Sequence, residues 1–141
     1  MAYLFDTDAI SEAFKPRPAR AYLDWLSRVP RADQFTSAVV VGELYKGAFA
    51  SSLAARHLEN IDQRVLAAVT VLPYDLAVAR IYGEIQAHLQ LRGQPLADAD
   101  LMIAATAIRH GLELVTGNVR HFARIPGLKL QRALADSRPP R

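Results

Sequence analysis

Short apolar runs alternate along this chain with longer stretches whose apolar residues recur at helical spacing. Runs typical of strands occur at 2–5, 34–37, 69–72 and 113–116, and the segments between them have helical periodicity. Strands separated by helices predict a parallel sheet, because parallel neighbours need a crossover connection. We therefore expect a three-layer α/β/α sandwich whose central, mostly parallel sheet has four to five strands, with 128–130 as an edge strand.

Polar and glycine residues mark where several of these helices begin and end. Asp8, Asp75 and Asp98 are expected N-caps, because a side-chain oxygen there satisfies a backbone N–H of the first turn. Gly111 is expected just past the end of a helix, where a left-handed conformation is common. The expected helices are 9–14, one that Pro16 and Pro18 open and Pro30 ends, 38–50, 53–68, one that Asp75 caps and that ends before Arg92-Gly93, and about 99–110.

Length and composition indicate one domain. The chain has 141 residues, of which 51% are hydrophobic, enough to bury a core. We assign residues 1–134 to this domain and expect 135–141 to be a disordered tail. The chain has no cysteine, which suits a reducing compartment. No basic leader opens the sequence, and no apolar run approaches the roughly 20 residues that span a bilayer. We therefore expect a cytoplasmic protein with no membrane partner.

The basic residues are concentrated toward the C-terminus. The formal net charge is +3, and from Arg109 onward seven Lys and Arg residues face only two acids, Glu113 and Asp136. Such an excess favours an anionic partner such as nucleic acid. It is also what a solvated surface needs for solubility, so charge alone leaves both explanations open.

Three acidic residues stand at positions otherwise suited to burial. Asp6 follows a central strand, Glu43 interrupts an apolar helical segment, and Asp100 begins the apolar face of a helix. Each also has an ordinary structural explanation. Asp6 could stabilise a turn or cap a helix, Glu43 could pair with Lys46 at i+3, and Asp100 could be favoured by the helix dipole.

Convergence of these three carboxylates would be costly without a counter-charge. At about 5 Å and an effective dielectric near 20, each pair repels by roughly 3 kcal/mol. Either some carboxyls stay protonated or a divalent cation neutralises them. A cluster of oxygen ligands selects Mg²⁺ or Mn²⁺, which can orient and deprotonate water for attack on a phosphodiester. The cluster therefore predicts phosphate chemistry.

Four segments occur in this order: LFDTD at 4–8, VGEL at 41–44, ADADLMIAATA at 97–107 and VTGNVRHF at 115–122. Together they resemble the PIN-domain ribonucleases, and in particular the VapC-type toxins of type II toxin–antitoxin pairs. The resemblance covers about Tyr3 to Leu130. It implies a PIN fold, Mg²⁺ or Mn²⁺ dependence, endonucleolytic cleavage of RNA, a homodimer or a larger toxin–antitoxin assembly, and neutralisation by a small VapB-like antitoxin.

The resemblance also assigns roles to residues. Asp6, Glu43 and Asp100 match the family's acidic triad of metal ligands. Asn118 stands where some members carry a fourth acid; an amide can place water or phosphate but supplies no charge, which weakens a second metal site. The residues expected to support the ligands are Thr7, Asp98 and Thr116.

A partner groove is a further implication. Antitoxins of this family lay a tail along the toxin, sometimes with a basic side chain entering the acidic pocket. Tyr22, Trp25 and Phe49 lie on expected helices and could border an apolar groove, although core packing explains aromatic residues equally well.

The sequence admits two other functions. Asp6-Thr7-Asp8 after a strand also resembles the haloacid dehalogenase-like phosphohydrolases, but these need a later lysine and a paired acidic motif, and no acidic pair follows Asp100. The second is a PIN-like RNA-binding module without catalysis, against which the three intact acids argue. The four histidines lack metal-ligand spacing and are expected at the surface or as partners of other groups.

Overall fold

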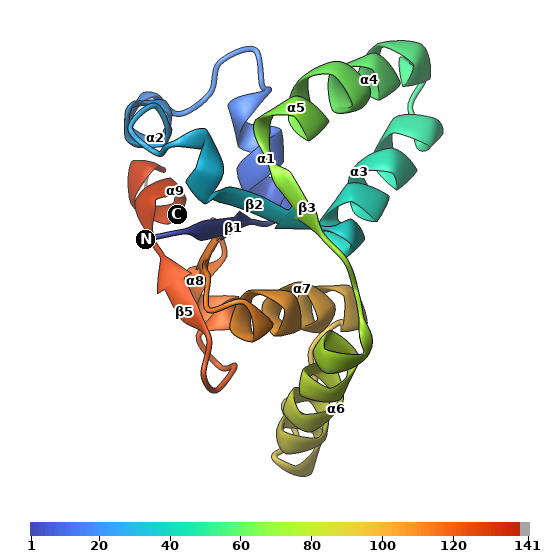
Figure 1. Ribbon diagram of the computed structural model, residues 1–141, viewed down its shortest axis with the longest axis vertical. Coiled ribbons are helices and arrows are strands. Elements are labelled where there is room, and N and C mark those ends of the chain that lie inside the picture. The colour runs from blue at the N-terminus through green and yellow to red at the C-terminus, as the bar shows by residue number, and fades with distance from the viewer. Residues whose placement is uncertain (139–141) are drawn as a thin grey trace.

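Five short strands form one parallel sheet in the order β3-β2-β1-β4-β5 (Figure 1). The computed structural model describes residues 1–138. Every strand pair is parallel, so the expected sandwich with a sheet of four to five strands is confirmed. The strands are β1 (Tyr3–Phe5), β2 (Gln34–Ser37), β3 (Thr70–Leu72), β4 (Glu113–Val115) and β5 (Lys129–Gln131).

Helices connect the strands and cover the sheet. Figure 1 shows α1, α4 and α5 on one side of the sheet and α7 on the other, and α6 packs on α7. The helices are α1 (Thr7–Ala13), α2 (Arg20–Leu26), η1 (Arg31–Asp33), α3 (Ala38–Ala50), α4 (Ala54–Asn60), η2 (Ile61–Val65), α5 (Leu66–Ala68), α6 (Leu76–Leu91), α7 (Asp98–Arg109), α8 (Val119–Phe122) and α9 (Ala133–Ser137).

The strand order reverses direction beside β1. From β1 the chain moves outward through β2 to β3, then crosses back to place β4 and β5 on the other side of β1. Parallel α/β sheets bind ligands beyond the carboxyl ends of the strands at such a switch point. The residues that follow β1 and β4, Asp6 and Thr116, therefore stand at the position where a ligand crevice is expected.

The core lies between the sheet and its covering helices. Leu4 and Leu114, side by side on β1 and β4, are fully buried. On α7, Ile103, Ala104 and Ala107 are buried, which is the apolar face that the sequence pattern predicts. Asp100 begins this face at its N-terminal end, so packing of α7 on the sheet brings that carboxylate toward the strand ends.

The expected helix boundaries are confirmed in part. β2 and α3 have the predicted bounds, Asp75 accepts from the Val78 N–H at 3.0 Å, and Gly111 has φ +64° beyond α7. Two capping assignments are wrong. Asp6, not Asp8, caps α1, and Ala97 precedes α7 without a side-chain cap, so Asp98 is the first residue inside that helix.

The C-terminal segment is ordered further than expected. Residues 133–137 form α9, which packs beside α2, and Leu134 is fully buried. The prediction of disorder from residue 135 is therefore wrong for 135–138, because a leucine anchors the helix to the core. Residues 139–141 of that predicted tail lie outside the described residues.

None of the helices in residues 1–138 combines the length and the apolar character needed to span a bilayer.

Candidate functional site

Asp6 is the buried centre of the site. It follows β1, is only 5% exposed, and accepts a hydrogen bond from the Ala9 N–H at 2.8 Å as the N-cap of α1. The sequence therefore leads from a buried strand straight into a helix whose first turn needs an acceptor. The capping explanation for Asp6 is correct, and it leaves the second carboxylate oxygen free of that bond.

The surroundings of Asp6 disfavour its charged form. The pKa of Asp6 is raised to about 7, mainly by burial and to a smaller extent by the negative charges of Asp8 and Asp100. Hydrogen bonds from the Thr116 side chain and the Ala9 backbone oppose this increase without cancelling it. A bound cation would therefore stabilise the ionised form of this carboxyl group near neutral pH.

Glu43 is linked to the residue that follows Asp6. Thr7 Oγ1 donates to Glu43 Oε1 at 2.6 Å, which joins the first turn of α1 to α3. Within residues 1–138, Glu43 makes no ion pair with Lys46, so the surface-pair explanation for this acid is wrong. The supporting role that the sequence predicts for Thr7 stays a prediction, and Glu43 is the acid that Thr7 contacts.

Asp100 has a histidine partner that sequence reasoning missed. His121 Nε2 lies 2.9 Å from Asp100 Oδ2, and the two side chains are 23% and 33% exposed. His121 belongs to α8, which begins after the loop that follows β4. The motif VTGNVRHF contains this histidine, but no spacing rule connects it with an acid 21 residues earlier.

The loop after β4 contributes Thr116 and Asn118 unequally. Thr116 is fully buried beside Asp6, and its hydroxyl also accepts from the Asn118 N–H at 3.0 Å. Asn118 is exposed, and the described contact is made by its backbone. Asp98 faces α6 instead: it accepts from Tyr82 Oη at 2.5 Å and Gln86 Nε2 at 3.2 Å.

The donor atoms of this region match a hard cation in kind. Asp6, Glu43 and Asp100 supply carboxylate oxygens, which Mg²⁺ and Mn²⁺ prefer. In residues 1–138, however, no three His, Cys, Asp or Glu side chains lie close enough to hold a metal ion as they stand. Glu43 is turned to Thr7 and Asp100 to His121. The assignment of the three acids as metal ligands thus stays a prediction.

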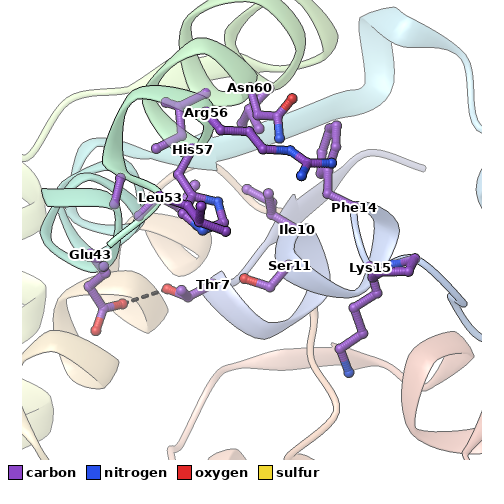
Figure 2. Close-up of a pocket in the computed structure, with 16 residues that line it drawn as sticks. Thr7, Ile10, Ser11, Phe14, Lys15, Glu43, Leu53, Arg56, His57 and Asn60 are labelled. Carbon is purple, nitrogen blue, oxygen red and sulfur yellow. Dashed lines mark hydrogen bonds between the residues drawn. The ribbon is translucent and has the colours of Figure 1, made fainter. Parts of the chain in front are cut away.

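A pocket of about 590 Å³ adjoins this region between α1, α3 and α4. Figure 2 shows the bonded pair Thr7 and Glu43 at one end of the pocket, with Arg56 and Phe14 toward the other. Its apolar lining includes Ile10 and Leu53. The pocket therefore combines an acidic end, an apolar wall and a basic side chain.

The aromatic residues singled out from the sequence divide between core and surface. Tyr22 is fully buried and donates to the Ala9 carbonyl at 2.9 Å. Trp25 packs edge-on against Tyr3, with ring centroids 5.1 Å apart. Phe49 is 69% exposed on α3. Core packing thus accounts for Tyr22 and Trp25, and Phe49 remains a surface aromatic.

Fold and site together define an α/β protein with a buried acid, Asp6, at the point where the order of a parallel sheet reverses. The family model described as the PIN domain matches residues 3–128. The chain therefore belongs to the PIN domain family.

Curated relatives include toxins and ribonucleases. Toxin FitB of Neisseria gonorrhoeae is 35% identical over 124 residues, which cover 84% of this chain and 89% of that protein. VapC ribonuclease Y4jK of Sinorhizobium fredii is 34% identical over 124 residues, with the same coverage of 84% and 89%.

Solved structures have the same fold. FitAcB from Neisseria gonorrhoeae matches with a TM-score of 0.83 and 30% identity, covering 92% of this chain and 96% of that chain. A toxin–antitoxin complex from Klebsiella pneumoniae matches with a TM-score of 0.68 and 26% identity, covering 90% of this chain and 95% of that chain.

Proposed function

We propose that this protein is a metal-dependent endoribonuclease of the VapC type, the toxin of a pair with a small VapB-like antitoxin. The observation that carries the proposal is Asp6: a carboxyl group buried to 5% exposure at the end of the central strand, whose pKa is raised to about 7. Burial of an ionisable group destabilises the folded protein, and buried groups with a shifted pKa are typical of functional sites. The relatives named VapC ribonuclease and toxin support the same activity.

Three acids would hold the metal ion. Asp6, Glu43 and Asp100 are the proposed ligands of Mg²⁺ or Mn²⁺, which when bound supplies Lewis acid chemistry for water activation and for charge that develops on the phosphate. Asp6 is fixed by the Ala9 N–H, Glu43 is oriented by Thr7, and Asp100 is oriented by His121. Orientation by such neighbours is what a ligand set needs.

Other residues would place the RNA. Asn118 is exposed at the edge of the site, where its amide can hydrogen-bond water or a phosphate oxygen. The excess of Lys and Arg after residue 109 favours approach of the polyanion and predicts activity that falls as salt increases. Because the chain has no cysteine and its proposed substrate is RNA, we place the activity in the cytoplasm.

The direct test is RNA cleavage by purified protein in Mg²⁺ and in Mn²⁺. Asp6→Asn, which keeps a capping oxygen, is expected to lower the rate by more than about 100-fold, because residues that only orient a ligand already cost 10- to 100-fold. Asp136→Asn is the matched control, since Asp136 pairs with Arg132 on α9 and is 64% exposed. Cleavage by Asp6→Asn at the wild-type rate would refute the role of Asp6.

The alternative of a binding module without catalysis has a distinct outcome. Such a protein would bind RNA and leave it intact in both Mg²⁺ and Mn²⁺ buffers. A haloacid dehalogenase-like phosphohydrolase would instead release phosphate from small phosphate esters. Either result would replace the nuclease assignment.

We assign the antitoxin partner to the pocket beside Glu43 as its proposed binding site. Its apolar wall suits a partner helix, and the acidic end suits a basic side chain. Co-expression with the short reading frame next to this gene is expected to relieve toxicity; no relief would count against the pairing. The proposed homodimer is tested separately by the mass of the purified protein in solution.

A further inference from the structure

Arg138 ties the C-terminal segment to the first helix. Its Nη1 donates to Asp8 Oδ2 at 2.7 Å, and its Nη2 donates to Asp8 Oδ1 at 2.8 Å. Nη2 also donates to Glu12 Oε1 at 2.8 Å. Two parallel bonds between a guanidinium and a carboxylate fix orientation as well as distance. The segment after α9 is thereby held against one face of α1.

Glu12 makes this contact an internal one. Its side chain is only 5% exposed, and its other oxygen, Oε2, accepts from the Ala19 N–H at 3.0 Å just before α2. One buried carboxylate therefore joins α1, the entry to α2 and the C-terminal guanidinium. Leu134, fully buried on α9, anchors the segment that carries Arg138.

Gly117 brings the loop after β4 into the same contact. A Cβ at Gly117 would collide with Arg138 Nη1 and Asp8 Oδ2. Its φ is not among the positive values found at other glycines, so space and not backbone conformation accounts for glycine here. The backbone of the loop therefore approaches the pair of Arg138 and Asp8 too closely for a side chain at position 117. Its neighbour Thr116 is the residue that hydrogen-bonds Asp6.

We propose that Arg138 is a positioning residue of the nuclease site. By holding Asp8 of α1 against Gly117, it sets where the first turn of α1 stands relative to the loop 116–118. These two segments carry Asp6 and Thr116, so the C-terminal segment completes a site made by the two central strands. The inference rests on the proposed function for its effect on catalysis, and on geometry alone for its effect on the two segments.

The kinetic test compares Arg138 with Arg80, an arginine in an exposed ion pair far along the chain from the C-terminal segment. Arg138→Ala is expected to lower kcat for RNA cleavage by about 10- to 100-fold with KM unchanged, since small misplacements near the chemistry have effects of this size. Arg138→Lys should recover only part of the loss, because lysine cannot make two parallel bonds. Arg80→Ala removes the same charge from an exposed pair with Glu84 on α6 and should cleave as wild type.

Gly117→Ala tests the same contact without changing charge. The added methyl group must displace the guanidinium, so kcat is expected to fall as it does for Arg138→Ala. Gly83→Ala is the matched control, because a Cβ there meets nothing within 4 Å. Should Arg138→Ala fail to fold, Arg138→Lys and Gly117→Ala decide the question.

Amide hydrogen exchange gives a readout that needs no activity. Arg138→Ala and Gly117→Ala should speed exchange at 7–9 and 116–118 relative to β2, and Arg80→Ala should not. This result separates the inference from the proposed function, because a protein that cleaves no RNA can still give it. Wild-type exchange at both segments would overturn the inference, and so would uniform destabilisation with unchanged kcat.

Discussion

Thr7 and Glu43, 36 residues apart in sequence, are joined by a hydrogen bond of 2.6 Å from the threonine hydroxyl to Glu43 Oε1. Thr7 is the residue after Asp6, so this bond connects the acid of α3 to the acid at the end of β1. Two of the three acids expected to act together are thus related through a single intervening side chain. The third, Asp100, acts on Asp6 through its charge.

Loss of the Thr7 hydroxyl should impair catalysis more than stability. Thr7→Val keeps the shape of the side chain and removes the bond that orients Glu43. We expect RNA cleavage to fall by about 10- to 100-fold, the usual effect of removing a partner of a ligand. The free energy of unfolding should fall by only about 1 kcal/mol. Thr7→Ser, which keeps the hydroxyl, is the control, and equal rates for both variants would contradict the role of Thr7.

Asp6 should make the protein less stable as pH rises toward neutral. Its pKa is about 7 in the folded state and 3.8 as a free side chain, so the folded state binds more protons between these values. The contribution of this group to the free energy of unfolding is fully present below about pH 4 and is lost as pH rises through 7. Asp6→Asn removes this loss and should be more stable by on the order of 4 kcal/mol above neutral pH.

Urea unfolding across this pH range, without divalent cations, measures the effect. The difference in free energy of unfolding between Asp6→Asn and wild type should increase as pH rises. Mg²⁺ should reduce this difference by stabilising the ionised carboxylate of wild type. A variant that is more stable yet inactive would also exclude misfolding as the cause of lost cleavage. A difference in free energy of unfolding that does not change with pH would contradict the assigned environment of Asp6.

Glu12 should stabilise the protein with the opposite pH dependence. Burial alone would raise the pKa of Glu12, but hydrogen bonds from Arg138, Lys15 and the Ala19 backbone outweigh it and lower the pKa to about 2, against 4.5 for the free side chain. Its contribution is therefore present above about pH 4.5 and lost as pH falls through 2. At neutral pH, Glu12→Gln should lower the free energy of unfolding by on the order of 3 kcal/mol.

Chemical denaturation at neutral and acidic pH checks this prediction. Glu84→Gln is the control, because Glu84 pairs with Arg80 on an exposed face and such pairs contribute at most about 1 kcal/mol. An effect of Glu12→Gln that persisted unchanged at pH values near 2 would show that charge is not the cause.

Local sequence patterns predicted the parts of the fold that local rules determine. β2 and α3 were expected at their observed bounds because a polar strand end, Ser37, meets a change to helical spacing, and Ser37 caps α3 from its side chain. Both wrong cap assignments have a local cause. Asp8 competes with Asp6 for the N-cap of α1, and α7 begins after Ala97 with no side-chain cap at all. In Asp6-Thr7-Asp8 both acids are plausible caps, and only the backbone path out of β1 decides for Asp6.

The contacts around the site depend on residues far apart in sequence. His121 contacts Asp100 because α8 follows the loop after β4. Arg138 contacts Asp8 across 130 residues of sequence. No spacing rule connects such pairs, so sequence reasoning placed the histidine at the surface or beside an unspecified partner and the arginine in a disordered tail. The three acids were accessible to sequence reasoning because each interrupts an apolar pattern.

The central claim, that Asp6, Glu43 and Asp100 form one metal site, is tested most directly by measuring Mn²⁺ binding through the loss of the free-ion EPR signal. We predict that wild type and Asp136→Asn bind Mn²⁺ alike. Asp6→Asn, Glu43→Gln and Asp100→Asn should each bind at least about 10-fold more weakly, since even the partners of ligands contribute that much to affinity. Wild-type Mn²⁺ affinity in all three variants would contradict the claim.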